Sequence, residues 1–477
     1  MPAKVRSFCK RHRAFLLSCA LFALLCVLLA RAGQRPDRYA VQAEWDAQAR
    51  TLRVEQTVLL TNRTGAALSV LDFHLYANAF SQEESAPVLP QERKYAYPEG
   101  FSPGGAEVAA VQVNGRDAPW ELSGEGDTVL RVFLPFRLRP QGGVEVRLSY
   151  SVALSDNRLR TGVSARDVRL CNAFATLCAH DGESFRHDAY GAIGDPFVSE
   201  CASWEVHLRA PTSLVAAGPG LVSASEGSWT FSGENLRDFA LVLSPDFCVA
   251  QGEVDGVTVR SFAFDQEGAQ QALDCAMRAL SVFGGLFGGY PFPDFTVCAA
   301  EFFPGGMEYP ALALVNAGLY ETENGMLEFA IAHEAAHQWW YAGVGSDQVL
   351  YPWQDEALAE YSTLLYYESL YGAQSFDSLY AARIRPATES LALQGVGVSQ
   401  SLDRFESGAV YDALVYRKGA AMLHDLRARL GNEAFVGALR KYYAENLFTV
   451  AAPGDLLAAF GPEGADRALR WLRGDLP

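Results

Sequence analysis

The sequence predicts an α+β protein, with an antiparallel β domain over residues 39–250 followed by a mainly helical domain over residues 255–477. Residues 144–152 alternate between apolar and polar side chains, which is the period of a half-buried strand. Residues 68–76 and 129–138 show a similar pattern, and Asn114-Gly115 is typical of a hairpin turn. Because this part lacks the spacing of parallel βαβ units, we expect its sheets to be antiparallel.

The pattern changes to helical periodicity after about residue 255. Residues 270–287 predict a helix that ends at Gly288-Gly289, and residues 295–300 predict a short buried strand. Helical patterns then dominate from Gly325 onward. With 477 residues, 49% of them hydrophobic and 20% charged, the chain is long enough for two or three domains with apolar cores.

The net charge and the first residues restrict the partners and the location. A net charge of −17 argues against nucleic acid as a partner, because binding phosphates needs a basic patch. A basic segment, residues 1–13, precedes an uninterrupted apolar run over residues 14–30. We expect a transmembrane anchor that places everything after about residue 35 outside the cytoplasm of the cell. A signal peptide cleaved near Ala32, which gives a secreted form, is the alternative.

Nine cysteines are present, and six of them follow the apolar run. An even number of cysteines in an exported region permits disulfides, and Cys171 with Cys178 is the nearest pair and the first candidate. Buried free thiols are the alternative. The six residues are Cys171, Cys178, Cys201, Cys248, Cys275 and Cys298.

The most informative motif is His333-Glu334-Ala335-Ala336-His337, followed by Glu356 after eighteen intervening residues. Two histidines at i and i+4 lie one turn apart on a helix, so both imidazoles reach the same ion. Glu356 adds an oxygen ligand from a second helix, and this set leaves the fourth position of a zinc ion open, as in catalytic sites. Glu334 is then free to act as the general base. The motif therefore predicts one catalytic zinc ion.

Two further segments accompany this motif, namely Gly305-Gly306-Met307-Glu308-Tyr309 and Val415-Tyr416-Arg417-Lys418-Gly419. In this order, the three motifs resemble those of the aminopeptidase N family of zinc metallopeptidases, the gluzincins. The resemblance implies a saddle-shaped β domain, a thermolysin-like catalytic domain and peptide substrates with a free N-terminus.

The resemblance also implies roles for single residues. Glu308 binds the α-ammonium group of the substrate, and Gly305, Gly306 and Met307 belong to an edge strand that runs along it. Tyr416 donates a hydrogen bond to the developing oxyanion. Two further assignments complete the predicted site: Tyr411 lines the pocket, and Glu360, one turn after Glu356, orients a metal ligand unless it faces solvent.

The chain departs from the family pattern at three points. Tyr309 replaces the usual Asn, Gly306 replaces Ala, and the sequence ends about sixty residues after Tyr416. We therefore expect a short, bacterial-type member without the large C-terminal helical domain, and a more open cleft. An endopeptidase, a dipeptide-releasing enzyme and a catalytically inactive peptide-binding module are the alternatives to an aminopeptidase.

Overall fold

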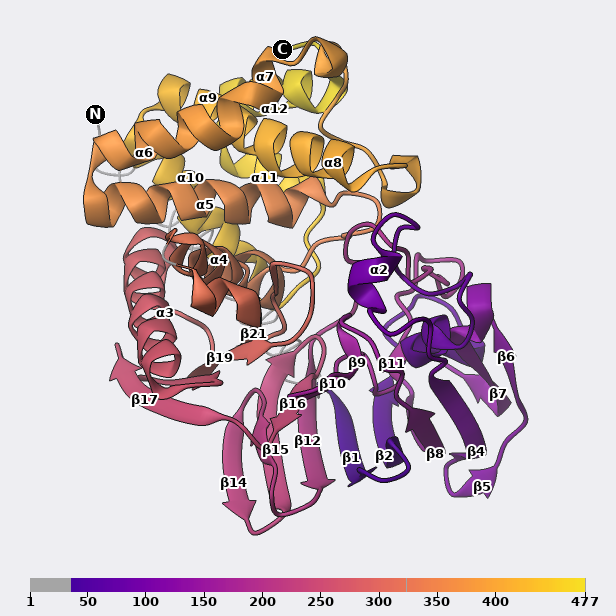
Figure 1. The fold of residues 1–477 in the computed structure, drawn as a ribbon. Coiled ribbons are helices and arrows are strands. Elements are labelled where there is room, and N and C mark those ends of the chain that lie inside the picture. Colours follow the sequence, from indigo (N-terminus) through magenta and orange to yellow (C-terminus); the bar gives the residue numbers. More distant parts are fainter. Residues whose placement is uncertain (1–35, 323, 477) are drawn as a thin grey trace, which may run out of the picture.

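The computed structural model describes residues 36–322 and 324–476, which form a β-rich half and a helical half (Figure 1). The β-rich half is built around an eight-stranded sheet with the order β14-β15-β12-β1-β2-β8-β4-β5. Its strands are β1 (Asp37–Asp46), β2 (Thr51–Thr61), β4 (Gly105–Val113), β5 (Arg116–Asp117), β8 (Gly143–Ala153), β12 (Ala202–Arg209), β14 (Leu221–Ser225) and β15 (Ser228–Leu236).

Two four-stranded sheets complete this half, with the orders β13-β16-β10-β9 and β11-β3-β7-β6. The first contains β9 (Thr161–Val163), β10 (Val168–Leu170), β13 (Val215–Ala217) and β16 (Leu241–Ser244). The second contains β3 (Leu68–His74), β6 (Trp120–Ser123), β7 (Val129–Leu138) and β11 (Thr176–Leu177). The short helix α2 (Arg93–Ala96) lies in the long connection between β3 and β4.

The strand pattern of the sequence is confirmed, but the purely antiparallel pairing is wrong at one position. In β8, the residues at alternate positions 144–152 are buried, and Asn114 and Gly115 have the positive φ angles, 50° and 74°, of a tight hairpin turn. The first strand, β1, however, pairs with β12 in parallel. The expectation assumed that parallel strands are joined by a short βαβ crossover. Because most of the domain separates β1 from β12 in the sequence, these strands pair in parallel without such a unit.

The helical half begins with a five-stranded sheet of order β17-β18-β19-β21-β20, and the chain passes from one half to the other between Ser244 and Cys248. The central strands β18 (Val257–Ala263), β19 (Asp294–Ala300) and β21 (Leu312–Asn316) are parallel. The edge strands β17 (Cys248–Val254) and β20 (Gly306–Met307) are antiparallel to their neighbours. Helix α3 (Gln266–Phe287) connects β18 to β19, and Asp265 caps its N-terminus by accepting from the backbone N–H of Gly268 at 2.7 Å.

Helices cover this sheet and form the rest of the half (Figure 1). The metal motif lies on α4 (Met326–Ala336) and the following π-helical turn η4 (Gln338–Gly343), and the third predicted ligand lies on α5 (Trp353–Tyr371). The remaining helices are α6 (Ala373–Leu379), α7 (Arg385–Glu389), α8 (Gly408–Tyr411), the π-helical segment η8 (Asp412–Lys418), α9 (Gly419–Leu430), α10 (Asn432–Asn446), α11 (Pro453–Ala459) and α12 (Gly461–Arg473).

Two predictions concern the N-terminus and the cysteines. The basic segment 1–13 and the apolar run 14–30 lie outside the described residues, and none of the helices in the described part of the chain is long and apolar enough to cross a membrane. The disulfide between Cys171 and Cys178 is wrong for this structure. All six cysteines that it describes are free thiols, and both members of the predicted pair are buried in apolar surroundings.

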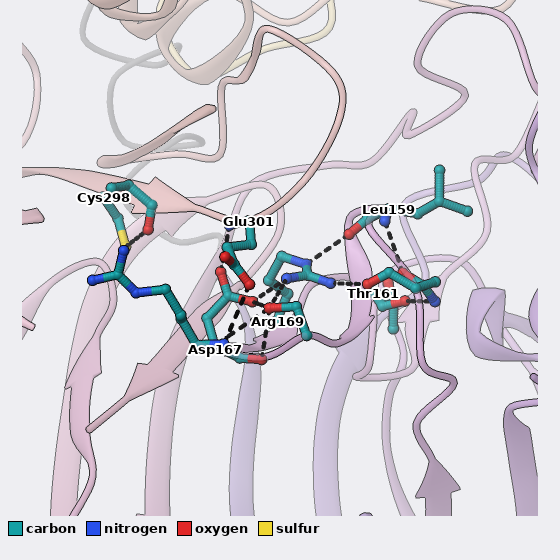
Figure 2. A network of polar contacts seen from close by, with 10 residues as sticks. Leu159, Thr161, Asp167, Arg169, Cys298 and Glu301 are labelled. Atoms are coloured by element: carbon teal, nitrogen blue, oxygen red, sulfur yellow. Dashed lines mark hydrogen bonds and ion pairs between the residues drawn. The ribbon is translucent and has the colours of Figure 1, made fainter. Parts of the chain in front are cut away.

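A buried polar network joins the two halves next to the edge strand β20 (Figure 2). Arg169 is fully buried, donates to the backbone carbonyl of Leu159 at 2.7 Å and pairs with Asp167. The other carboxylate oxygen of Asp167 accepts from the backbone N–H of Glu301 at 2.6 Å, and the N–H of Phe303 donates to the carbonyl of Arg158 at 2.8 Å. The β-rich half therefore holds the segment that leads from β19 into β20.

Candidate functional site

The three predicted metal ligands converge on one point. The Nε2 atoms of His333 and His337 lie 3.2 Å apart, and Oε2 of Glu356 lies 3.3 Å from the first and 3.2 Å from the second. Helix α4 is buried because its sequence is apolar on all sides apart from these groups. The helix ends at Ala336, and non-helical angles at Trp340 turn the chain away directly after the second histidine.

The hydrogen bonds around this cluster fit a bound cation. Nδ1 of His337 faces the carbonyl of Trp340 at 3.1 Å, so Nδ1 carries the proton and Nε2 presents its lone pair to the cluster. Nδ1 of His333 similarly faces Oε2 of Glu360 at 3.6 Å. Oε2 of Glu356 is buried and receives no hydrogen bond from the described residues. Two imidazoles and a carboxylate are a zinc-binding set, so the residues present fit one zinc ion.

Glu360 is fixed behind this cluster. The side chain is only 1% exposed, which excludes the solvent-facing alternative. Arg383 donates to both of its carboxylate oxygens, at 3.0 and 3.4 Å, and the guanidinium of Arg383 lies 4.1 Å from the ring centre of Phe329. Arg383 thus holds the carboxylate of Glu360 at 3.6 Å from Nδ1 of His333.

Glu334 lies against the backbone of the edge strand. A Cβ atom built on Gly306 would be 2.0 Å from Oε1 of Glu334, so only glycine leaves room for this carboxylate. Glu334 is 6% exposed, and its Oε2 has no hydrogen-bond partner among the described residues. Burial and, next, the charge of Glu308 raise the pKa of Glu334 well above its usual value. A carboxylate with a raised pKa is a better proton acceptor than an ordinary one.

Glu308 follows β20 at the edge of the sheet and reaches the same place. Each of Glu308, Glu334 and His337 has one ligand atom within 4.8 Å of the others. Glu308 is 4% exposed, and its Oε1 has no partner in the part of the chain that the structure describes. Of the other predicted residues of this segment, Gly305 is exposed, whereas the side chain of Met307 is buried in the core, so only its backbone is available to a ligand.

Two tyrosines close the opposite side of the metal cluster. The hydroxyl of Tyr416 donates to Oε1 of Glu356 at 2.6 Å, and its ring stacks on His333 with a centroid distance of 5.8 Å. Tyr411 packs edge-on against Tyr416 at 5.6 Å. Both belong to the irregular helix of α8 and η8, which the buried Lys418 anchors by donating to the carbonyls of Leu393 and Val396. The structure therefore brings Tyr416 and Tyr411 to the site.

Sequence reasoning missed Asp195, which the β-rich half contributes to the site. One carboxylate oxygen each of Asp195, Glu308 and Glu356 lie within 4.8 Å of one another. Arg160 forms an ion pair with Asp195 and is its charge partner. Burial raises the pKa of Asp195 to about 7, although Arg160 opposes this shift. No fixed spacing connects residue 195 to the zinc motif, so the sequence offered no signal for it.

Tyr309 shows what replaces the polar group of the family's Asn. Its ring is fully buried, and its hydroxyl donates to Oδ1 of Asn172 at 3.1 Å. The amide of Asn172 in turn donates to Asp238 at 2.8 Å. This buried chain of hydrogen bonds anchors the residue after Glu308 to the β-rich half.

Comparisons with known sequences agree with this site. Residues 271–472 match the peptidase family M1 domain. The chain is 28% identical over 283 residues to Aminopeptidase M1 of Arabidopsis thaliana, a match that covers 54% of this chain and 32% of that protein. It is 27% identical over 377 residues to Aminopeptidase N of Lactobacillus helveticus, covering 73% of this chain and 43% of that protein. The chain thus corresponds to about a third to two fifths of the length of these relatives.

Solved structures share the two-domain fold. The M1 zinc metallopeptidase of Deinococcus radiodurans superposes with a TM-score of 0.66 at 21% identity, covering 93% of this chain and 96% of that one. A mutant of that protein was solved with Tyr-Ser-Ala as substrate, and a two-domain M1 zinc metallopeptidase mutant was solved with L-arginine. The predicted fold class is therefore confirmed, with mixed rather than purely antiparallel sheets in the first half. Residues 271–472, which carry all three motifs, therefore match the M1 family of zinc metallopeptidases, the family of aminopeptidase N, and the chain shares the fold of M1 zinc metallopeptidases of known structure.

Proposed function

We propose that this protein is a zinc-dependent aminopeptidase that removes N-terminal residues from peptides. The carboxylate of Glu308 carries this proposal. It is buried and lacks a hydrogen-bond partner among the described residues, and it lies beside Glu334 and the zinc ligands. A buried carboxylate without a partner is costly, and a substrate ammonium group supplies the missing charge-assisted hydrogen bonds. A charge anchor next to the reacting groups restricts cleavage to the first peptide bond.

The side chains of the site have distinct tasks in this reaction. His333, His337 and Glu356 would hold a zinc ion, which would supply a Lewis acid that brings the pKa of water towards neutrality. Glu334 accepts the proton of the attacking water and passes it to the leaving amine. The hydroxyl of Tyr416 donates to the oxygen that becomes negative, and one such donor is typically worth about 3 kcal/mol. Burial also keeps the phenol protonated, because it raises the pKa of Tyr416 well above its usual value.

Negative charge around the ammonium position supports the same assignment. Asp195 adds a second carboxylate beside Glu308 from the other half of the molecule. The relatives named above are aminopeptidases, and the bound tripeptide and amino acid of the structural neighbours are ligands with a free ammonium group. These ligands belong to other proteins, and they are consistent with the substrate class proposed here.

Two variants test the proposal. Glu334→Gln removes the base but keeps the shape of the side chain, so it should abolish hydrolysis of aminoacyl 4-nitroanilides while zinc remains bound at one ion per chain. Glu308→Gln should raise KM for peptides and abolish the preference for a free over an acetylated N-terminus. If wild-type enzyme cleaves acetylated peptides as fast as free ones, it is an endopeptidase or releases longer fragments. A wild-type protein with neither zinc nor turnover is a binding module.

We also propose that the catalytic part acts outside the cytoplasm. This proposal rests on the basic residues before the apolar run 14–30 in the sequence. A full-length chain should fractionate with membranes if the run is an anchor and appear in the medium if it is cleaved near Ala32. External protease added to intact cells or spheroplasts should degrade the anchored form. Recovery of the intact protein in the cytoplasmic fraction would contradict this location.

A further inference from the structure

The direction of a bound peptide follows from Glu308, which directly follows the edge strand β20, and from Glu334 on α4, which lies against that strand. Glu308 marks the ammonium end, and Glu334 lies against Gly306, so the first peptide bond lies beside Gly306. A peptide that pairs with this edge therefore runs from Glu308 past Gly306 to Gly305 and on towards Phe303. This reasoning rests on the proposed aminopeptidase function.

A cavity of about 520 Å³ opens at the end of this path. Phe303 and Asn316 line it from the catalytic half, and Lys94 and Arg158 line it from the β-rich half. The backbone N–H of Phe303 donates to the carbonyl of Arg158 at 2.8 Å, which places Arg158 beside the path. Asn316, which lines the cavity, donates from its backbone N–H to the carbonyl of Gly305 at 3.0 Å and from its side-chain amide to the carbonyl of Phe303 at 3.2 Å. The cavity therefore lies next to the part of the path beyond Gly306, where the second and third residues after the cleaved bond lie.

The charges on the cavity wall differ in how far they are already paired. The acidic residues of the wall are Asp265, Glu301 and Glu321. Asp265 caps α3, and Glu301 accepts from the backbone N–H of Arg166 at 3.2 Å. The guanidinium of Arg166 is 3.3 Å from Asp246, and it also stacks on the ring of Phe264. Asp265, Glu301 and Arg166 are therefore committed to contacts within the protein, whereas Glu321 is exposed at the cavity.

Lys94 and Arg158 are different. Within residues 36–322 and 324–476, neither has a carboxylate within 4.0 Å, and both side chains are exposed at the cavity. The ammonium of Lys94 lies 4.7 Å from the ring centre of Tyr95, and Arg158 uses only its backbone to contact its neighbours. Two unpaired cations at this position attract an anionic group on the far end of the substrate.

We propose that this cavity binds the α-carboxylate of a short peptide, with Lys94 and Arg158 as the residues that recognise it. The carboxylate of a tripeptide or a tetrapeptide lies at the right distance from Gly306. The enzyme therefore recognises both ends of its substrate: Glu308 binds the ammonium group, and the cavity binds the carboxylate. It is selective for peptides of three or four residues.

The test compares peptides that differ only at the carboxyl end. We would measure kcat/KM for a tripeptide with a free carboxylate, its C-terminal amide, and an amidated tripeptide with Asp at the third position. The variants are Lys94→Gln with Arg158→Gln in one chain, and Arg116→Gln as a matched control. Arg116 is an exposed arginine in β5, at the far edge of the eight-stranded sheet.

Wild-type enzyme and the Arg116→Gln control should prefer the free acid over the amide by about fivefold, since an exposed charge pair contributes up to about 1 kcal/mol. The double variant should lose this preference, and high salt should reduce it in the wild type. Equal rates for acid and amide in the wild type, or a preference that survives in the double variant, would overturn the proposal. If the amidated peptide with Asp at the third position is cleaved as fast as the free acid, the cavity binds any carboxylate at this position, and the proposed recognition of the α-carboxylate is overturned. Wild-type enzyme that releases no N-terminal residue from any of these tripeptides would overturn the proposed function itself.

Discussion

The contact between Gly306 and Glu334 makes one substitution especially informative. In Gly306→Ala, the new methyl carbon would lie 2.0 Å from Oε1 of Glu334, 2.4 Å from Cδ and 2.7 Å from Cγ. Real Cβ atoms essentially never approach a heavy atom closer than 3.0 Å, so Oε1 must move by at least 3.0 − 2.0 = 1.0 Å. Because Cγ is also too close, a rotation of the terminal carboxylate alone does not relieve the contact.

The size of the effect follows from this displacement. A misplacement of about 1 Å in a reacting group costs roughly a hundredfold in rate, which corresponds to about 2.7 kcal/mol in activation free energy. The three heavy atoms nearest to the new methyl group all belong to Glu334 and none to a zinc ligand, so metal binding should not change. We therefore expect kcat for an aminoacyl 4-nitroanilide to fall by about a hundredfold at unchanged zinc content.

The neighbouring glycine provides the matched control. Gly305 precedes the same edge strand, but a Cβ atom added to it meets no atom within 4 Å. Gly305→Ala introduces the same change in composition and backbone entropy without touching Glu334. It should retain wild-type kcat, and both variants should unfold at similar urea concentrations.

The motif of the aminopeptidase N family, which this segment resembles, carries Ala where this chain has Gly306, and this makes the outcome decisive. If Gly306→Ala retains activity within about twofold, Glu334 occupies another rotamer during the reaction. The base would then not be positioned by the bare backbone of β20, and the reasoning would be refuted.

Four further outcomes are expected. Glu360→Gln should weaken zinc binding by at least about tenfold, measured by competition with a chelator, because the carboxylate no longer orients His333. Tyr416→Phe should lower kcat by about a hundredfold or more at little change in KM, because it removes the donor to the oxyanion. Burial raises the pKa of Asp238 from 3.8 to about 7. The folded protein therefore gains free energy of unfolding from the protonated carboxyl group below about pH 3.8, and this contribution is lost as the pH rises through about 7. Wild-type protein should therefore lose stability between about pH 4 and pH 7 relative to Asp238→Asn in urea unfolding. Removal of zinc should lower the melting temperature, because it leaves Glu356 buried beside other carboxylates.

Local sequence patterns predicted those parts of the site that lie close together in the chain. His333 and His337 are neighbours because a helix has 3.6 residues per turn, and α4 is buried because it is apolar on all sides. The structure brings Glu356 from α5 to the same point, and Glu308 and Tyr416 also reach it. The resemblance to a family supplied these last two residues, because their own spacing carries no geometric information.

Long-range placement could not be predicted in this way. Asp195 reaches Glu308 because three sheets and the network around Arg169 fix the two halves against each other, and no single-sequence pattern encodes that arrangement. The parallel pairing of β1 with β12 has the same origin, since it joins strands from the two ends of the β-rich half. The disulfide was predicted only because the exported part contains an even number of cysteines, and the structure shows these cysteines as free thiols.

The buried acids of the site explain why a metal and an ammonium group belong there together. Asp195, Glu308, Glu334 and Glu356 bring up to four negative charges into a small volume that is largely shielded from water. Arg160 offsets one of them, and burial together with the charge of Glu308 raises the pKa of Glu334. A zinc ion offsets the charge at Glu356, and a substrate ammonium offsets the charge at Glu308. Occupation of one position therefore removes repulsion that the other would otherwise have to overcome, and a ligand without the ammonium group leaves Glu308 buried and unpaired.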